Sequence, residues 1–198
     1  MKLIIASNNA HKVTEIKAIL SPFFNEIVTL KEAGIDIDVE ENGTTFCENA
    51  VKKATEILAA VPFADAAISD DSGLMVDALN GAPGVYSARF AGDGHDDEAN
   101  NRKLVEMLKN VPQDKRTGRF VSAVALARRE KDTLTAEGSV EGIILNEGRG
   151  ENGFGYDPLF YYEPLNKTFA ELTADEKNSL SHRKKALTAL YELLSKEV

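Results

Sequence analysis

The stretch "AISDDSGLMV", residues 67–76, places two carboxylates and a hydroxyl between two apolar runs. The runs on either side are short and rich in branched and apolar side chains, which predicts a strand on each side of the polar group. A polar side chain at the end of a strand is held by a rigid element. Asp70, Asp71 and Ser72 are therefore expected to cap a turn, to bind a cation or to take part in chemistry.

Helices and strands alternate along the chain. The run "KLIIA" at residues 2–6 predicts a buried strand, and apolar residues at helical spacing follow it. Thr45 and Glu48 form the pattern of a capping box, which predicts that a helix starts there. The other expected elements are strands at 26–30, 66–69, 73–79 and 119–128, a helix over 97–110, an antiparallel partner for strand 119–128 in "LTAEGSVEGIIL", a strand in "PLFYY" and one closing helix in "TADEKNSLSHRKKALTALYELL". This order predicts a mixed α/β fold.

The composition limits the classes of protein that fit. With 198 residues, of which 43% are hydrophobic, the chain is expected to form one domain over residues 1–198. A net charge of −9 argues against a nucleic acid polymer as partner, because that surface needs clustered Lys and Arg. Cys47 is the only cysteine, so no intrachain disulfide is possible. The apolar run after Lys2 is too short for a signal peptide, and no segment is long enough to span a membrane, so we expect a cytoplasmic protein.

Several familiar motifs match only in their letters. "GRGENG" at 148–153 has the glycine spacing of a dinucleotide fingerprint, but "FGYDP" follows it instead of a helix. "DSG" at 71–73 also occurs in aspartic proteases. Their two catalytic carboxylates lie in a β-rich dimer or pseudo-dimer, and the helices expected in this chain argue against that fold. The segment "DGHDDEANN" at 93–101 lacks the glycine and terminal glutamate of a calcium loop, so a solvated turn with an Asp helix cap is expected. The three histidines lie far apart, which argues against zinc.

The segment "SNNAHK", residues 7–12, follows the first predicted strand. A turn from a strand into a helix leaves backbone N–H groups without partners at the positive end of the helix, where an anion is stabilised. Ser7, Asn9 and Lys12 add donors and one charge. The ordinary alternative is an asparagine helix cap with a solvent-exposed lysine.

Carboxylates recur in pairs in "VEENG", with Glu40 and Glu41, and in "SDDSG", with Asp70 and Asp71. Hard oxygen ligands from separate loops suit Mg²⁺, which takes one or two carboxylates and completes its shell with water and phosphate. Two solvated acidic turns are the alternative.

The C-terminal third contains aromatic and basic groups. "GFGYDP" presents Phe154 and Tyr156 beside Asp157, and aromatic rings in glycine loops often stack on planar ligands, although packing in the core is equally compatible. "EKNSLSHRKK" places cations at the start of a helix, where the dipole opposes them: Lys177, His182, Arg183, Lys184 and Lys185. These groups indicate an anion or base to be bound, or else a solvated basic face.

The order of these motifs is more specific than any one of them. Ordered along the chain, S-x-N-x-x-K, E-E-x-G-x-T-F-x-E-N-A, D-D-S-G-L, G-A-P-G-x-Y-S-A-R, G-F-G-Y-D-P and E-K-x-x-x-S-H-R resemble the inosine/xanthosine triphosphate pyrophosphatase family, from Ser7 to Arg183. The resemblance implies a Mg²⁺-dependent homodimer that hydrolyses ITP, dITP and XTP to the monophosphate and pyrophosphate. It also implies an elongated mixed β-sheet flanked by helices, with two lobes around a central cleft. Glu151 and Asn152 depart from the small residues of many relatives, which affects only the detail of that loop.

The resemblance also implies roles for individual residues. It assigns the triphosphate to Ser7, Asn8, Asn9, Ala10, His11 and Lys12. It makes Glu40 and Asp71 the Mg²⁺ site, with Asp71 also as the base, and it places Ser72 against the substrate. It assigns the nucleobase to Phe154, Gly155, Tyr156, Asp157, Lys177, His182 and Arg183.

Two other functions are compatible with a similar chain. One is a nucleotide pyrophosphatase of related fold that acts on modified pyrimidines, which would lack the S-H-R pattern. The other is a nucleotide-sensing module that binds without cleavage. Turnover separates them, because a sensor has no use for a water-bearing metal beside the phosphates.

Overall fold

The structure of the chain, a computed structural model, describes residues 1–197 except for the side chain of His11. Within this range the strands form one sheet in the order β2-β1-β3-β4-β5-β6-β7. Their bounds are β1 Lys2–Ile5, β2 Glu26–Thr29, β3 Ala66–Val76, β4 Thr117–Arg128, β5 Lys131–Ile144, β6 Phe160–Tyr162 and β7 Lys167–Thr168. β1 is parallel to β2 and β3, whereas β6 is antiparallel to β5 and β7. The prediction of an α/β fold with a mixed sheet is therefore confirmed.

Within residues 1–197 the structure has five α-helices, and α2 begins at the capping box that the sequence predicts. Their bounds are α1 Ala10–Leu20, α2 Phe46–Ala60, α3 Asp97–Leu108, α4 Ala174–Leu180 and α5 His182–Ser195. Thr45 and Glu48 form the capping box of α2, and Thr173 and Glu176 form that of α4. Asp96 caps α3, because its side chain accepts a hydrogen bond from the backbone N–H of Ala99. In each case a side chain supplies the acceptor that a backbone N–H of the first turn lacks.

The chain divides into two compact units. The first consists of Met1–Asp71, Ser122–Gly138 and the chain from Arg183 onward, and the second consists of Ser72–Val121 and Ser139–His182. β3, β4 and β5 contribute residues to both units, and the first and last boundaries fall inside the D-D-S-G and S-H-R motifs.

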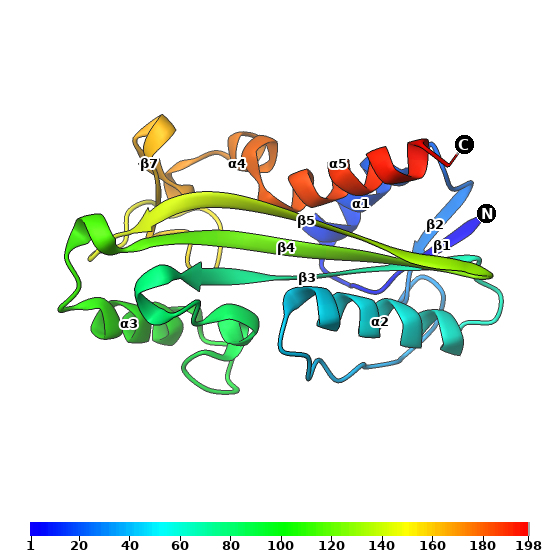
Figure 1. Ribbon diagram of the computed structural model, residues 1–198, viewed down its shortest axis with the longest axis horizontal. Coiled ribbons are helices and arrows are strands. Elements are labelled where there is room, and N and C mark those ends of the chain that lie inside the picture. Colours follow the sequence, from blue (N-terminus) through cyan, green and yellow to red (C-terminus); the bar gives the residue numbers. More distant parts are fainter. Residues whose placement is uncertain (198) are drawn as a thin grey trace. The chain divides into compact units, whose positions relative to one another are not determined.

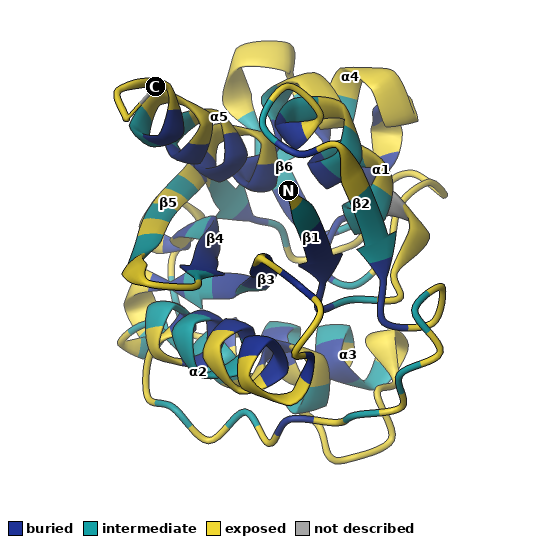
Figure 2. Ribbon diagram, turned by 90° about the vertical axis from the view of Figure 1, so that its right-hand side faces the viewer, coloured by how far each residue is buried: buried dark blue, intermediate teal, exposed yellow. Residues whose placement is uncertain are grey.

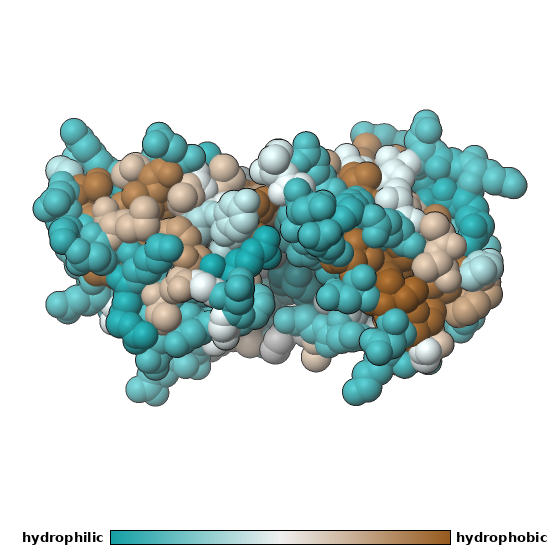
Figure 3. Space-filling model, turned by 90° about the horizontal axis from the view of Figure 1, so that it is seen from below, coloured by the Kyte–Doolittle hydropathy of each residue, from teal (hydrophilic) through white to brown (hydrophobic). Residues whose placement is uncertain are grey.

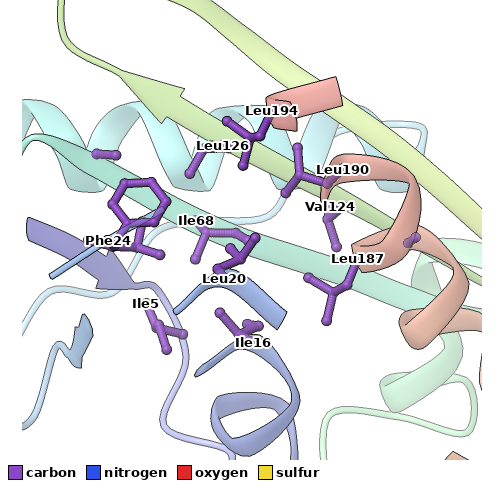
Figure 4. Packing of buried hydrophobic residues seen from close by; sticks show 13 residues of the cluster. Ile5, Ile16, Leu20, Phe24, Ile68, Val124, Leu126, Leu187, Leu190 and Leu194 are labelled. Atoms are coloured by element: carbon purple, nitrogen blue, oxygen red, sulfur yellow. The ribbon is translucent and has the colours of Figure 1, made fainter. Parts of the chain in front are cut away.

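In the first unit, α1 and α5 cover one face of the strands and α2 covers the other (Figures 1 and 2). β1 is therefore buried on both faces, which explains why its sequence is apolar without alternation. Figure 4 shows side chains from α1, α5 and the strands packed into one cluster. Its members include Leu3, Ile5, Ile16, Leu20, Phe24, Ile68, Val124, Leu126, Leu187, Leu190 and Leu194.

In the second unit, α3 lies on one side of the strands and α4 lies on the other (Figure 1). Aromatic rings make up much of its core. The ring centroids of Phe120 and Phe160 are 4.5 Å apart, and those of Phe160 and Phe169 are 4.8 Å apart. Leu104 and Leu108 of α3 are fully buried in the same cluster.

Two predictions about the elements are wrong. β3 is one strand from Ala66 to Val76, and it does not break at the two aspartates. The side chains of Asp70 and Asp71 have partners within the extended strand, so polarity did not mark a turn. The closing segment is two helices, because Ser181 has an extended backbone between α4 and α5. No Gly or Pro lies in residues 173–195, so the sequence carries no signal that marks the break.

The surface carries hydrophobic residues among many hydrophilic ones. Figure 3 shows brown areas separated by teal on the face that it presents. Phe63 and Phe154, one in each unit, are more than half exposed. No helix in residues 1–197 is long and apolar enough to cross a membrane.

The core of the first unit generates a stability prediction. Leu190 is fully buried in the cluster of Figure 4. We expect Leu190→Ala to lower the free energy of unfolding by about 2–5 kcal/mol, because the truncation leaves a cavity. Thr188→Ala, an exposed position two residues away on α5, is the control and should change stability by less than about 0.5 kcal/mol. Equal urea midpoints for the two variants would contradict this packing.

Candidate functional site

Asp70 is a buried carboxylate at the centre of a group of charges in the first unit. Its side chain is 1% exposed. Lys12 Nζ lies 2.9 Å from Asp70 Oδ1, and Arg183 Nε donates to Asp70 Oδ2 at 3.0 Å. Arg183 Nη1 also lies 3.7 Å from Glu15 Oε2. The group therefore balances two cations with two carboxylates supplied by α1, β3 and α5.

The charge state of Asp70 follows from two opposing effects. Burial raises the pKa of a carboxyl group, but the charges of Lys12 and Arg183 and their hydrogen bonds outweigh it here and lower the pKa of Asp70 to about 2. Asp70 is therefore ionised at neutral pH. A buried carboxylate of this kind is tolerated only while its cationic partners are in place.

The segment before α1 combines both interpretations of "SNNAHK". Asn9 Oδ1 accepts a hydrogen bond from the backbone N–H of Lys12 at 3.2 Å, and the N–H of Asn9 donates to Ser7 Oγ at 3.2 Å. Asn9 is thus the helix cap that the ordinary alternative predicted. The lysine half of that alternative is wrong, since the Lys12 side chain is only 22% exposed and is paired with Asp70. Asn8 and Ala10 are exposed, and the predicted His11 side chain lies outside the described residues.

Asp71 is partly exposed and is held by a side chain that the sequence did not single out. Asn49 Nδ2 donates to Asp71 Oδ2 at 2.9 Å, and Asn49 Oδ1 accepts from the N–H of Gly43 at 2.7 Å. Asn49 lies in the first turn of α2 and is 2% exposed. A Cβ on Gly43 would lie 2.7 Å from Asn49 Oδ1, so this acidic loop approaches α2 closely. A buried amide beside a carboxylate is a signal that only the structure reveals.

The predicted metal ligands supply a small donor set. Glu40 is exposed, with Asn42 Nδ2 at 3.4 Å from its Oε2, while Glu41 forms an ion pair with Lys53. Within the described residues, no three or more His, Cys, Asp or Glu side chains gather to hold a metal ion. The carboxylate oxygens of Glu40 and Asp71 nevertheless fit the chemistry of Mg²⁺, which needs only one or two protein ligands when phosphate and water complete its shell. The two-carboxylate site remains a prediction.

A second group of predicted residues lies in the second unit. Asp157 is buried, accepts a hydrogen bond from the N–H of Phe154 at 2.9 Å and forms an ion pair with Lys177. Lys177 Nζ lies 4.3 Å from the centroid of the Phe154 ring, which is 59% exposed. Gly153 is required at its position, since a Cβ there would lie 2.1 Å from Asp157 Oδ2. Burial raises the pKa of Asp157, and Lys177 opposes that effect without cancelling it.

Other predicted residues of this unit are buried. Tyr156 is 4% exposed and donates its hydroxyl to the carbonyl oxygen of Ser87 at 2.8 Å. Of the two alternatives for this ring, core packing therefore holds. His182 is also buried, with its ring stacked on Phe120 at 5.3 Å between centroids. Ser72, at the start of the unit, is partly exposed.

The structure thus brings the predicted residues together in two groups. In the first unit Lys12 and Arg183 meet at Asp70, with Asp71 next in sequence. In the second unit Phe154, Asp157 and Lys177 are in mutual contact. The first group offers charges and helix-end N–H groups, which suit an anion, and the second offers an exposed ring beside a cation, which suits a planar ligand.

Comparisons with known proteins agree along the whole chain. Residues 3–193 match the model of the Ham1 family. A curated relative from Desulforamulus reducens, named dITP/XTP pyrophosphatase, is 53% identical over 99% of this chain and 96% of its own. One of the same name from Bacillus subtilis is 49% identical over 96% of both. The solved structure of the Staphylococcus aureus Ham1 protein is similar with a TM-score of 0.92 and 41% identity, and covers 100% of both chains.

The charges around Asp70 generate a prediction about stability and pH. Asp70→Asn leaves Lys12 and Arg183 without their shared anion, so we expect a loss of about 3–5 kcal/mol in the free energy of unfolding at pH 7. The folded-state pKa of Asp70 lies below its ordinary value of 3.8, so its stabilising effect is present above pH 4 and is lost as the pH falls toward about 2.

Urea unfolding at several pH values checks this prediction. The gap between the natural chain and Asp70→Asn should be widest at pH 5–7 and should narrow below pH 4. Asp36→Asn, at an exposed position, is the control and should show little difference at any pH. A gap of constant size across the acid range would show that the charge of Asp70 is not what stabilises the fold.

Proposed function

The chain belongs to the Ham1 family, and we propose that it hydrolyses the deaminated purine nucleoside triphosphates ITP, dITP and XTP to the nucleoside monophosphate and pyrophosphate. The predicted enzyme class, a nucleoside-triphosphate pyrophosphatase, agrees with the names of the curated relatives. The observation that carries the proposal for this chain is the Lys12 ammonium group, fixed on Asp70 in the first turn of α1.

A fixed ammonium group at a helix N-terminus suits a polyphosphate. The N–H groups of the first turn and the positive end of the helix dipole favour an anion, and Lys12 adds an ammonium group that is ion-paired with Asp70. Because Asp70 holds Lys12 in place, less side-chain freedom is lost when a phosphate binds. We assign the triphosphate to residues 7–12.

Asp71 is the proposed catalytic residue. Asn49 fixes its Oδ2, so the carboxylate has a defined orientation before substrate binds. We propose that Asp71 accepts the proton of the water that attacks the α-phosphorus, and that Ser72 contacts the substrate beside it. Glu40 and Asp71 would hold Mg²⁺, which when bound would offset charge on the phosphate oxygens. Pyrophosphate is the leaving group.

Selection of the base follows from hydrogen-bond polarity. Hypoxanthine and xanthine present an acceptor at O6 and a donor at N1, whereas adenine presents a donor at position 6 and an acceptor at N1. Donors from Lys177 and His182, both in the second unit, would suit O6 and would face adenine's amino group donor to donor. Each buried mismatch costs about 1–3 kcal/mol. A mismatch at position 6 together with one at N1 would discriminate against ATP by roughly a hundredfold or more.

Two further properties belong to the proposal. We propose that the protein is a homodimer, in which the exposed Tyr86 of the "APGVYSARF" segment is a candidate contact residue. A measurement of the molar mass in solution tests the dimer. We propose a cytoplasmic location, because the nucleotide pool that such an enzyme clears is there.

Removal of the Asp71 carboxylate tests the catalytic assignment. We expect Asp71→Asn to lower the rate of pyrophosphate release from ITP at saturating Mg²⁺ by a factor of about 10²–10⁴, because the proton acceptor and a metal ligand are lost together. Asp93→Asn, at an exposed position, is the control and should retain the natural rate. The assignment fails if Asp71→Asn turns over at full rate.

Truncation of Phe154 tests the base-stacking assignment. The ring is exposed, so Phe154→Ala should leave stability unchanged and should raise KM for ITP roughly tenfold, as expected for the loss of one stacked base. Phe63→Ala removes an equally exposed ring from the other unit and should leave KM unchanged. Steady-state kinetics with ITP, XTP, dITP, GTP and ATP, with and without Mg²⁺, measures both effects. A similar KM for the two variants would refute stacking on Phe154.

A further inference from the structure

Two side chains of α3 bind the backbone of one glycine in the G-F-G-Y-D-P motif. The N–H of Gly155 donates to Asp97 Oδ2 at 2.7 Å. The carbonyl oxygen of the same residue accepts a hydrogen bond from Asn101 Nδ2 at 2.8 Å. Asp97 and Asn101 are four residues apart on one helix and therefore lie on the same face of it. Both ends of Gly155 are thus held by a single rigid element.

Because of the position of Gly155, these two bonds restrain the backbone conformation of the loop. Its φ is +60°, in the left-handed region that favours glycine, and it stands between the exposed Phe154 and the buried Tyr156. The N–H bond fixes the peptide group that follows Phe154, and the carbonyl bond fixes the one that precedes Tyr156. The two bonds therefore hold the backbone that directly follows Phe154 and so limit where the Phe154 ring can lie.

We propose that Asp97 and Asn101 are positioning residues for base recognition, which hold the Phe154–Asp157 loop so that the Phe154 ring and the Lys177 ammonium group face the nucleobase. The inference rests on the function proposed above. Neither side chain needs to touch the substrate, because each acts through Gly155.

A purely structural role for these residues is less well supported by the contacts. Capping of α3 is done by Asp96, whose Oδ1 accepts from the N–H of Ala99 at 3.0 Å, so Asp97 Oδ2 is directed to another segment. Asn101 Oδ1 is buried and has no hydrogen-bond partner among the described residues. The bond to Gly155 is therefore the contact that orients the Asn101 amide, and it is made to the proposed base-binding loop.

The test compares neighbouring positions on the same helix. Asp97→Ala and Asn101→Ala should each raise KM for ITP roughly tenfold with little change in kcat, because a hydrogen bond that orients the loop is lost. Asp96→Ala removes the helix cap but no contact with Gly155, so it should lower stability while KM stays at the natural value. Asp97→Asn should restore KM, since its side-chain oxygen can still accept from the N–H of Gly155.

Two readouts separate positioning from a general loss of structure. In the Phe154→Ala background, Asp97→Ala should add little to KM, because both changes act on the same ring. The amide proton of Gly155 should exchange with solvent at least tenfold faster in Asp97→Ala than in Asp96→Ala. Tripolyphosphate should inhibit Asp97→Ala and Asp96→Ala as strongly as it inhibits the natural chain, because the proposed phosphate-binding residues are unchanged in both.

The outcomes distinguish this inference from the proposed function. If the natural chain cleaves ITP but Asp97→Ala and Asn101→Ala keep its KM, the positioning role is wrong and the function stands. If Asp97→Ala raises KM by the same factor with and without Phe154, the residue acts by another route and the inference is also wrong. If the natural chain neither cleaves ITP nor binds IMP, both fail.

Discussion

The first unit depends on one buried ion cluster, in which the Asp70 carboxylate bridges Lys12 and Arg183. A charge removed from water is tolerated only when opposite charges and hydrogen bonds replace the solvent. Meeting this requirement brings the start of α1, the middle of β3 and the start of α5 together at one point, although they are far apart in the sequence. The same cluster holds the Lys12 ammonium group at a helix N-terminus, and Asp71, the next residue along β3, is held by Asn49. Structural and proposed catalytic carboxylates are thus neighbours with different environments.

The second unit is stabilised mainly by aromatic packing. Its core is largely aromatic, and Tyr156 and His182 belong to buried packing, while Phe154 remains exposed beside Lys177. Asp157 links these features, since its buried carboxylate accepts from the backbone at Phe154 and pairs with Lys177. The chemistry of an anion and the chemistry of a ring are therefore carried by separate units of the chain. The function proposed for this member of the Ham1 family assigns the triphosphate to the first group and the nucleobase to the second.

The sequence predicted features that rest on local physics. The capping box at Thr45, an aspartate helix cap within residues 93–101 and the buried strands follow from short-range hydrogen bonding and apolar patterns, and the structure confirms them. Features that depend on tertiary contacts were missed. The partner of Lys12, the continuity of β3 through its aspartates and the burial of Tyr156 and Asn49 depend on residues distant in sequence, which one sequence without relatives cannot locate. Ser181 belongs to the same class, because its extended backbone interrupts an otherwise helical pattern.

The position of bond cleavage tests most directly whether the protein releases pyrophosphate by attack at the α-phosphorus. Hydrolysis of ITP in ¹⁸O-labelled water, with the products separated and weighed by mass spectrometry, shows which phosphorus the water attacks. Attack at the α-phosphorus predicts one labelled oxygen in IMP and none in pyrophosphate. Release of labelled inorganic phosphate together with IDP would place the attack at the γ-phosphorus and would contradict the account.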